Sequence, residues 1–315
     1  MVFSARAGAA SWTGTTSLPD SYNGHAMVYA SGRLYHTGGI SLNGGILDGI
    51  KVFFAPISPS GTAGAWTPGP PLPEAVFYHA SAAAGGFVYV LGGYHYTDAS
   101  GMAISDAVYY AKVDTDGGLG AWQSAGRLPQ PVFFPSAAVW NGRLYVTGGC
   151  NGSALTNAVY SAVVNPDGSL GSWTAQKPLP VAVYTHTEVS SGTLYVLGGT
   201  VNGGADIQNA VYFAKINADG TLADWAAGSP LPQPVANHAA VLANGRVFVL
   251  GGWTGSAPTD AVESASVAAD GSLGLWSSET SLPRQLYLHA AATDGSYVYI
   301  SGGNDPSVMR AEVYS

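Results

Sequence analysis

The chain has very little cysteine and very little charge, and both shortages exclude classes of protein. Its single cysteine, Cys150, cannot form an internal disulfide or a multi-cysteine metal site. Charged residues make up 10% of the 315 residues, and the net charge is −8. The 11 lysines and arginines are scattered along the chain, whereas a nucleic-acid binder needs clustered cations. We therefore expect no nucleic-acid partner.

Long apolar runs are also missing. No stretch of about 18 or more apolar residues occurs, so we expect no transmembrane helix. The opening MVFSARAG lacks the apolar segment of a signal peptide, and Met1 is compatible with the initiator of a trimmed, mature chain. Because low charge with abundant Gly, Ala, Ser and Thr favours an exported protein, we expect a secreted or periplasmic location, with the cytoplasm as the alternative.

Glycine, by contrast, is abundant and occurs in a repeat. A glycine pair ends six short apolar runs of the type YVLGG, and six Leu-Pro pairs and six tryptophans recur in the same phase, about 50 residues apart. The first glycines of the pairs are Gly38, Gly92, Gly148, Gly198, Gly251 and Gly302. The tryptophans are Trp12, Trp66, Trp122, Trp173, Trp225 and Trp276. Such a period with strand-like runs predicts a propeller array.

The fourth repeat shows the expected parts of one blade. Segments 185–190, 193–199 and 209–216 predict three strands, and the Asp219-Gly220 turn leads into a fourth strand that ends near Trp225. The final unit stops at AEVYS, after its third strand, so we expect the segment around Trp12 to supply its outer strand. One aromatic of strand two recurs in phase and predicts packing between blades: Tyr35, Tyr89, Tyr145, Tyr195, Phe248 and Tyr299.

The glycine pair after an apolar strand, the Tyr three residues before it, the late Trp and a histidine near the start of strand one resemble the kelch repeat. The resemblance covers essentially the whole chain. It implies an all-β fold, a single six-bladed β-propeller of four-stranded blades over residues 1–315. The expected blades are 19–68, 73–124, 129–175, 180–227, 232–278, and 283–315 plus 1–14. The resemblance does not imply one function, because kelch-like propellers include scaffolds, lectin-like binders, oxidases, isomerases and specifier proteins.

Two departures from the kelch pattern narrow this range. Many kelch repeats carry an Arg just before the strand-one histidine, whereas segments such as AVFY and PVFF stand there in this chain, and only Arg284 lies nearby. The Tyr-Cys pair and metal ligands of copper oxidases are not recognisable, and neither is the iron motif of specifier proteins. We therefore expect no cofactor and no metal.

Aromatic residues are dense in the loops after the glycine pairs and before strand one, which in kelch-like propellers emerge on the same face. Aromatic rings bind sugar faces, apolar ligands or cations, so we expect a ligand cup there, with packing between blades as the alternative. The longer loops 40–50 and 94–107 are expected to form a partial lid. The predicted ligand-binding residues are Tyr22, His25, Phe77, Tyr78, His79, Tyr94, His95, Phe133, Phe134, Cys150, Tyr184, Asn237, His238, Trp253, Tyr287, His289 and Asn304.

Five histidines lie six residues after the proline of a Leu-Pro pair, and Pro135 takes this place in the third repeat. The kelch resemblance favours a structural role, in which each ring bonds the backbone of a neighbouring blade. A metal site and proton transfer are the alternatives. The five are His25, His79, His186, His238 and His289.

Glu188 follows His186 by two residues, so both should lie on the same side of the innermost strand. A carboxylate near the axis would be desolvated and its pKa raised, as a general acid or base requires. A glutamate satisfied by neighbouring amides is the structural alternative. We name Glu188 and His186 as candidate catalytic residues. The equivalent positions in the other repeats are Met27, Ser81, Ala137, Ala240 and Ala291.

These features lead to three hypotheses about function. The first is a monomeric propeller that binds a small molecule or glycan in an aromatic cup, with carbohydrate as the first ligand class. The second is an isomerase, cyclase or lyase without a cofactor, in which Glu188 and a His or Tyr move protons. The third is a scaffold for protein interactions.

Overall fold

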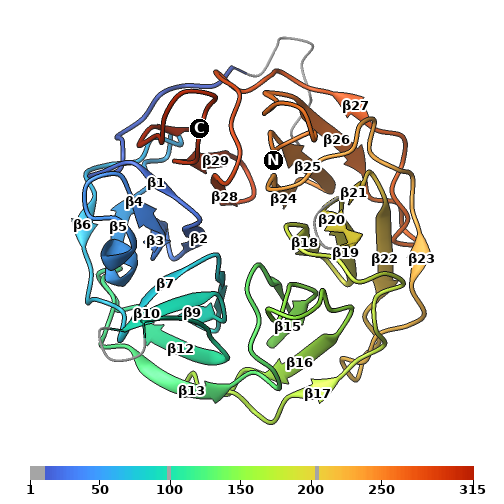
Figure 1. Cartoon of the computed structure of the whole chain (residues 1–315), viewed down its shortest axis with the longest axis horizontal. Helices are drawn as coiled ribbons and strands as arrows, with labels where there is room; N and C mark the ends of the chain where they lie inside the picture. The colour runs from blue at the N-terminus through green and yellow to red at the C-terminus, as the bar shows by residue number, and fades with distance from the viewer. Residues whose placement is uncertain (1–10, 98–100, 203–205) are drawn as a thin grey trace.

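The structure is a computed structural model, and it describes residues 11–97, 101–202 and 206–315. Within these residues, six antiparallel sheets stand like blades around one axis (Figure 1). In each sheet the first strand of the repeat lies nearest the axis and later strands lie successively further out. The first strands of neighbouring sheets contact one another around the ring, so they form the wall of the axis.

The first three blades follow one another along the chain. Blade 1 contains β2 (Ala26–Ala30), β3 (Arg33–Thr37), β5 (Val52–Pro56) and β6 (Thr67–Pro68). Blade 2 contains β8 (Ala80–Ala84), β9 (Phe87–Leu91), β12 (Ala107–Lys112) and β13 (Gln123–Arg127). Blade 3 contains β14 (Ser136–Trp140), β15 (Arg143–Thr147), β16 (Val159–Val163) and β17 (Thr174–Ala175).

The last three blades complete the ring. Blade 4 contains β18 (Thr187–Ser190), β19 (Thr193–Leu197), β22 (Val211–Lys215) and β23 (Ala226–Ala227). Blade 5 contains β24 (Ala239–Ala243), β25 (Arg246–Leu250), β26 (Val262–Ser266) and β27 (Ser277–Ser278). Blade 6 contains β28 (Ala290–Thr293), β29 (Val298–Ser301) and β30 (Val313–Tyr314).

Blade 6 is completed by the other end of the chain. Thr13 N–H donates to Ser315 O at 2.9 Å, and Ser315 N–H donates to Thr13 O at 3.0 Å. Thr15 N–H donates to Val313 O at 2.9 Å. The segment after Trp12 therefore takes the outer position beside β30, as the sequence predicts, and pairs the two ends of the chain.

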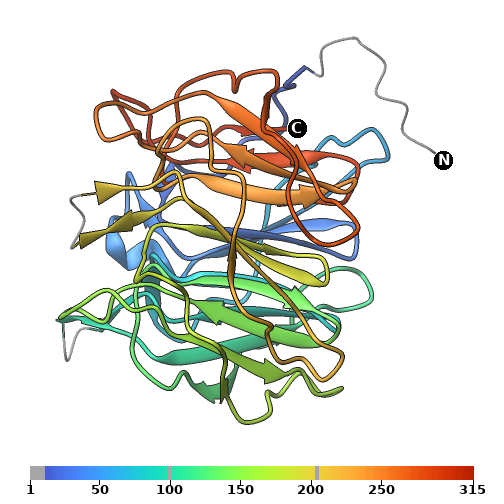
Figure 2. The same ribbon diagram turned by 90° about the vertical axis from the view of Figure 1, so that its right-hand side faces the viewer.

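Short elements gather at one end of the ring, which we call the mouth face (Figure 2). They come from the loops after the glycine pairs and before strand one, so these two loop sets share a face, as expected. The elements are β1 (Tyr22–Asn23), β4 (Ile40–Ser41), the 3-10 helix η1 (Ile46–Ile50), β7 (Ala75–Phe77), β10 (Tyr94–Thr97), β11 (Gly101–Ile104), β20 (Thr200–Val201) and β21 (Asp206–Ile207).

The repeated glycine pair allows neighbouring blades to approach closely. In blade 3, Gly148 and Gly149 have φ angles of 58° and 96°, which glycine adopts without steric cost. Gly149 N–H donates to Val183 O at 2.8 Å, and a Cβ on Gly148 would lie 2.6 Å from the same oxygen. A larger residue would therefore push blades 3 and 4 apart.

Repeated aromatics link the blades further from the axis. Tyr195 is fully buried, and its hydroxyl donates to the carbonyl of Gly271 in the next blade at 2.8 Å. Trp122 is half-buried, and its Nε1 donates to Pro70 O of the preceding blade at 3.0 Å. These contacts support the expected packing of blade on blade. Equivalent tyrosine bonds join Tyr35 to Gly117 and Tyr89 to Gly168.

The outer strand of blade 4 differs from the prediction. The sequence predicts a fourth strand that ends near Trp225, but β23 begins directly after this residue. Trp225 instead turns toward blade 3, where its Nε1 donates to Lys177 O at 2.9 Å. The residues that pair with β22 are therefore Ala226 and Ala227, directly after Trp225. In the described part of the chain, no helix has the length and apolar character needed to cross a lipid bilayer.

Candidate functional site

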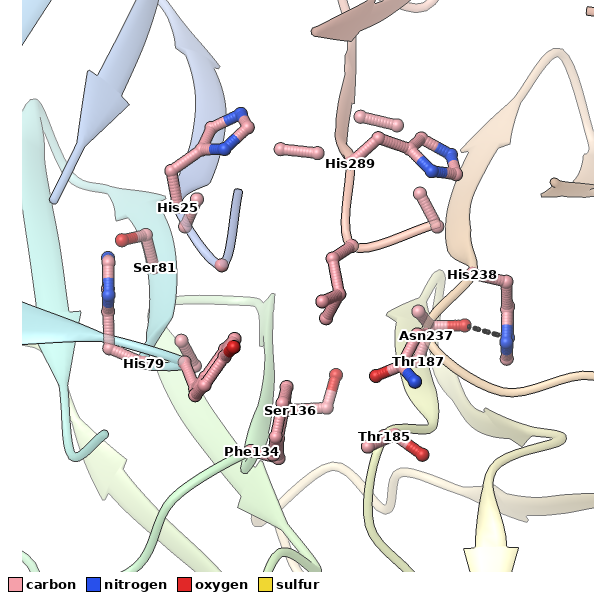
Figure 3. A pocket seen from close by; sticks show the side chains of 18 of the residues that line it. His25, His79, Ser81, Phe134, Ser136, Thr185, Thr187, Asn237, His238 and His289 are labelled. Carbon is pink, nitrogen blue, oxygen red and sulfur yellow. Dashed lines mark hydrogen bonds between the residues drawn. The ribbon is translucent and has the colours of Figure 1, made fainter. Parts of the chain in front are cut away.

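The first strands leave a cavity of about 200 Å³ on the axis, at the mouth face (Figure 3). Six equivalent residues, each directly before the histidine position of strand one, line it: Gly24, Tyr78, Phe134, Thr185, Asn237 and Leu288. We call these six the mouth ring. Below the cavity, alanines bring the first strands together, and a second hollow of about 270 Å³ lies further along the strands, lined by residues such as Tyr29, Leu242 and Thr293.

Every mouth-ring residue adopts a left-handed backbone conformation. The φ angles are 54° at Tyr78, 50° at Phe134, 54° at Thr185 and 56° at Leu288. Glycine and asparagine accept this region readily, whereas a β-branched or bulky residue there is strained by roughly 1–2 kcal/mol. Strain of this kind persists where the surrounding structure enforces it, and it is concentrated at functional sites.

Backbone hydrogen bonds run around the mouth ring and hold it in this conformation. Each bond joins the N–H of one ring residue to the carbonyl of its counterpart in the preceding blade. Five such bonds are present: Tyr78 to Gly24 and Phe134 to Tyr78 at 2.8 Å, Asn237 to Thr185 at 3.0 Å, Leu288 to Asn237 at 2.9 Å and Gly24 to Leu288 at 3.3 Å. Because these amides are used within the ring, a ligand meets mainly its side chains.

One wall of the cavity is aromatic. Tyr78 and Phe134 stack with ring centroids 4.2 Å apart and planes at 24°. Behind them, Phe133 lies 4.5 Å from Tyr94 and 6.3 Å from Tyr184, measured between ring centroids. The aromatic residues of blades 2, 3 and 4 thus form a continuous surface, and burial raises the pKa of Tyr78, so its phenol is neutral. Of these rings, Tyr78 and Phe134 line the cavity itself.

The remaining walls are polar on one side and apolar on the other. Ser136, Thr185, Thr187 and Asn237 line the cavity from blades 3 to 5 (Figure 3). Leu288 and the alanines and methionine of blades 6 and 1 line the opposite side. Among the described side chains that line the cavity, none is Asp, Glu, Lys or Arg. The described side chains therefore suit a ligand with one face to stack and several groups to hydrogen-bond.

The histidines beneath the mouth ring join neighbouring blades. His79 Nε2 lies 3.0 Å from Thr37 Oγ1 of blade 1, and His186 Nε2 lies 2.9 Å from Thr147 Oγ1 of blade 3. Four of the five histidines bond a hydroxyl of a neighbouring strand in this way, which supports the structural role for these four: His25, His79, His186 and His238. The partner is a hydroxyl side chain, whereas the expected partner was a backbone group. At the other seams Leu91, Leu197 and Leu250 stand at the hydroxyl position; Pro135 replaces the histidine only after Leu91.

Burial keeps these imidazoles neutral. Loss of hydration lowers the pKa of His79 and His238 to about 3 and that of His186 and His289 to about 4. Loss of hydration and the neighbouring imidazoles hold the pKa of His25 well below its ordinary value. Within the described residues, no group of three His, Cys, Asp or Glu side chains is placed to hold a metal ion.

The predicted site residues divide into two sets. Eight line the cavity: His25, Tyr78, His79, Phe134, His186, Asn237, His238 and His289. The others lie outside it: Tyr22, Phe77, Tyr94, His95, Phe133, Cys150, Tyr184, Trp253, Tyr287 and Asn304. Tyr22 and Phe77 are 0% and 3% exposed, so these two are core residues and the prediction for them is corrected. Tyr22 is buried because it stands where Val76 and Val132 stand in the next repeats.

Most of the outer set lies in the paired loops around the cavity. Phe133 pairs with Cys150, and Tyr287 pairs with Asn304. Trp253 lies 5.6 Å from Tyr287, so a second aromatic pair stands on the side of blades 5 and 6. The side chains in these pairs are half-buried and remain candidates for contact with a ligand larger than the cavity.

His95 belongs to a separate cluster. Its Nδ1 lies 2.6 Å from Glu74 Oε2, and Tyr109 OH donates to Glu74 Oε1 at 3.1 Å. This carboxylate therefore fixes the hairpin of β10 and β11 to the loop before β7.

Glu188 pairs with Val196 between β18 and β19, at the level of Ser81 and Ala137 in their blades. Its side chain lies outside the part of the chain that the structure describes. Its catalytic role stays a prediction.

Sequence reasoning missed the polar residues Ser81, Ser136, Thr185 and Thr187 of the cavity, as well as Leu288 and the small residues that line it. In blades 4 and 6 the aromatic pattern points to the neighbouring residues Tyr184 and Tyr287 instead. Their place in the repeat could have identified the mouth-ring residues, because each directly precedes the histidine or, in the third repeat, Pro135.

Comparison with known proteins assigns this propeller to a family. The model of the KLHDC2/KLHL20/DRC7 Kelch-repeats domain matches residues 136–315, which is more than half of the chain. The chain therefore belongs to the kelch-repeat family, as the repeat pattern predicts. Its fold is that of a propeller that binds ligands or other proteins.

Individual relatives are distant. Kelch repeat and BTB domain-containing protein 12 of Danio rerio is 27% identical over 186 residues, which cover 54% of this chain and 29% of that protein. Kelch-like protein 23 of Mus musculus is 24% identical over 251 residues, covering 79% of this chain and 40% of that protein. The chain thus spans less than half the length of these relatives. The solved structure of YjhT shares the fold, with a TM-score of 0.75 and 14% identity over 96% of this chain and 95% of that chain.

Proposed function

We propose that this propeller binds an uncharged carbohydrate in the cavity of the mouth ring. The observation that carries the proposal is the stacked pair Tyr78 and Phe134 facing a polar wall that includes Thr185 and Asn237, with no charged group among the described lining side chains. A sugar ring offers an apolar face for stacking and hydroxyls for hydrogen bonds, so its two kinds of surface match these two walls.

The size of the cavity limits what enters it. Its volume of about 200 Å³ is below the ~300 Å³ at which most pockets for drug-sized ligands begin. One sugar ring is therefore the natural unit in the cavity. Further rings of a longer glycan would lie over Tyr94, Phe133 and Tyr184, outside the cavity.

Calorimetric titration with a panel of methyl glycosides tests the proposal. Phe134→Ala should abolish measurable binding, because it removes half of the stacking surface. Tyr297→Ala is the matched control, since this exposed tyrosine lies away from the cavity, and it should leave the affinity unchanged. Binding that survives Phe134→Ala, or no binding by any glycoside, contradicts the proposal.

A second candidate is proton-transfer catalysis on the same ligand. It is favoured by the position of Glu188, whose strand β18 also carries Thr187 of the polar wall. Glu188→Gln should then abolish turnover, followed by NMR of the bound sugar, and leave its affinity nearly intact. An unchanged turnover rate would exclude this candidate and leave binding as the function.

A further inference from the structure

The backbone bonds around the mouth ring close five seams between blades and leave the sixth open. In the described residues, the N–H of Thr185 donates to no backbone carbonyl, and the carbonyl of Phe134 accepts from no backbone N–H. The equivalent atoms at the other seams lie 2.8–3.3 Å apart and are bonded. The opening therefore lies between blades 3 and 4 and presents one donor and one acceptor.

The open seam coincides with the polar wall of the cavity. Ser136 and Thr187 flank it from the first strands of blades 3 and 4 (Figure 3). Thr185 Oγ1 is already occupied by Thr200 Oγ1 at 3.0 Å, and Thr187 Oγ1 by His238 Nε2 at 2.8 Å. Asn237 Oδ1, in the next blade, is buried and has no hydrogen-bond partner. Asn237 Oδ1 is thus a further acceptor close to the two backbone groups of the open seam.

Backbone N–H and C=O groups of folded proteins are generally paired with another protein group, with water or with a ligand. Five of the six seams obey this rule within the ring itself. The sixth can obey it when a bound molecule supplies an acceptor for the Thr185 N–H and a donor for the Phe134 carbonyl.

We propose that the ligand completes the mouth ring at this seam, with two adjacent hydroxyls that accept from Thr185 N–H and donate to Phe134 C=O. This inference rests on the proposed function, and it names the part of the sugar that is recognised. The stacked pair Tyr78 and Phe134 then holds the apolar face of the same sugar ring, since Phe134 supplies both a ring to the wall and the carbonyl at the seam.

Replacing single backbone amides by esters tests the seam directly. An α-hydroxy acid in place of Thr185 removes the N–H that we assign to the ligand, and it turns the Tyr184 carbonyl, which accepts from Thr200 N–H at 2.9 Å, into a weaker ester acceptor. It should lower the stability of the free protein less than the control ester does, and it should weaken binding of the tightest methyl glycoside about tenfold, the worth of one hydrogen bond. The matched control is leucic acid at Leu288, whose N–H bonds Asn237 O at 2.9 Å, and it should lower the stability of the free protein.

The outcomes separate this inference from the proposed function. If the ester at Thr185 destabilises the free protein as much as the ester at Leu288, the seam is closed and the inference is wrong. If glycosides bind, Phe134→Ala abolishes binding and the Thr185 ester leaves affinity intact, the function holds and the inference fails. A deoxy glycoside that lacks the hydroxyl accepting from Thr185 N–H should lose the same factor as the ester, and no further loss should follow when both changes are combined.

Discussion

Two layers of this propeller differ in whether equivalent positions of the six repeats keep the same residue. Away from the axis, strand-two tyrosines, tryptophans and glycine pairs recur, and most make the same contact in blade after blade. At the mouth ring, the six equivalent positions carry six different residues, from Gly24 to Leu288. The backbone of the ring nevertheless repeats its conformation in every blade.

The difference separates assembly from recognition. A repeated residue serves a contact that each blade needs, such as the approach of Gly148 to Val183. Where the backbone conformation repeats but the side chain varies, the side chain is not needed for the contact between blades. The mouth ring can therefore carry stacking residues on one side and polar residues on the other. Changes in the repeated layers should affect stability, and changes in the ring should affect binding.

Acid gives the largest expected effect, because it acts on the repeated histidine layer as a whole. The unfolded chain binds more protons than the folded one below pH 6.5, because burial lowers the pKa of four rings from the ordinary 6.5 to about 3 or 4: His79, His186, His238 and His289. Stability is therefore fully present above that value and is lost as pH falls toward 4. At pH 5 each such histidine should cost about 2 kcal/mol, and several together approach the whole stability of a domain.

Urea unfolding at pH 7.5 and pH 5 measures this loss. His79→Gln should reduce the proton uptake on unfolding by about one. A midpoint that stays constant between the two pH values would show that the histidines are not held neutral by burial.

A pair of tyrosines sharpens the comparison between the layers. Tyr195→Ala empties a fully buried site and removes the bond to Gly271, so it should cost about 3–5 kcal/mol and leave glycoside affinity unchanged in the folded fraction. Tyr78→Ala in the ring should cost little stability and abolish binding. Calorimetry of glycoside binding and urea unfolding, carried out on both variants, measure these two effects. Equal losses of stability would contradict the separation of the repeated layer from the mouth ring.

The repeated layer could be predicted from the sequence because its residues adopt the structures that their types and spacing favour. A glycine pair after an apolar run, an in-phase Tyr and a late Trp indicated blades, their order and the closure by the segment after Trp12. The outer strand of blade 4 was misplaced, because Trp225 bonds Lys177 O and the strand begins after it. The outer strands of blades 1, 2, 3 and 5 begin directly after their in-phase tryptophans in the same way.

The mouth ring could be predicted only in part because its backbone contradicts the preferences of its residues. Gly24 and Asn237 are ordinary in a left-handed turn, but Thr185, Phe134 and Leu288 disfavour it, so no local signal marks their conformation. The ring bonds between blades impose it. Sequence reasoning therefore found aromatic density and the histidines, and it missed Thr185 and Leu288.

Thr37→Val tests one seam of the repeated layer at a smaller scale. It removes the hydroxyl 3.0 Å from His79 Nε2 while keeping the shape of the side chain, so a buried imidazole nitrogen loses its partner. The expected cost is about 1–3 kcal/mol at pH 7.5, measured by urea unfolding. A second replacement, His79→Pro, recreates the Leu91 and Pro135 type of seam, and the double variant should lose less than the sum of the single changes.

Thr185→Gly should give the smallest change in stability, and it tests the backbone strain of the mouth ring directly. Glycine adopts a φ of 54° without strain, so this variant should be more stable than the parent by about 0.5–1 kcal/mol. Asn237→Gly is the control, because asparagine already tolerates its φ of 51°, and it should gain only a few tenths of a kcal/mol. Thr185→Gly keeps the backbone N–H at the open seam, so the variant should still bind glycosides. A loss of stability at Thr185→Gly would mean that the threonine contacts outweigh the strain, and that the side chain at this ring position serves assembly after all.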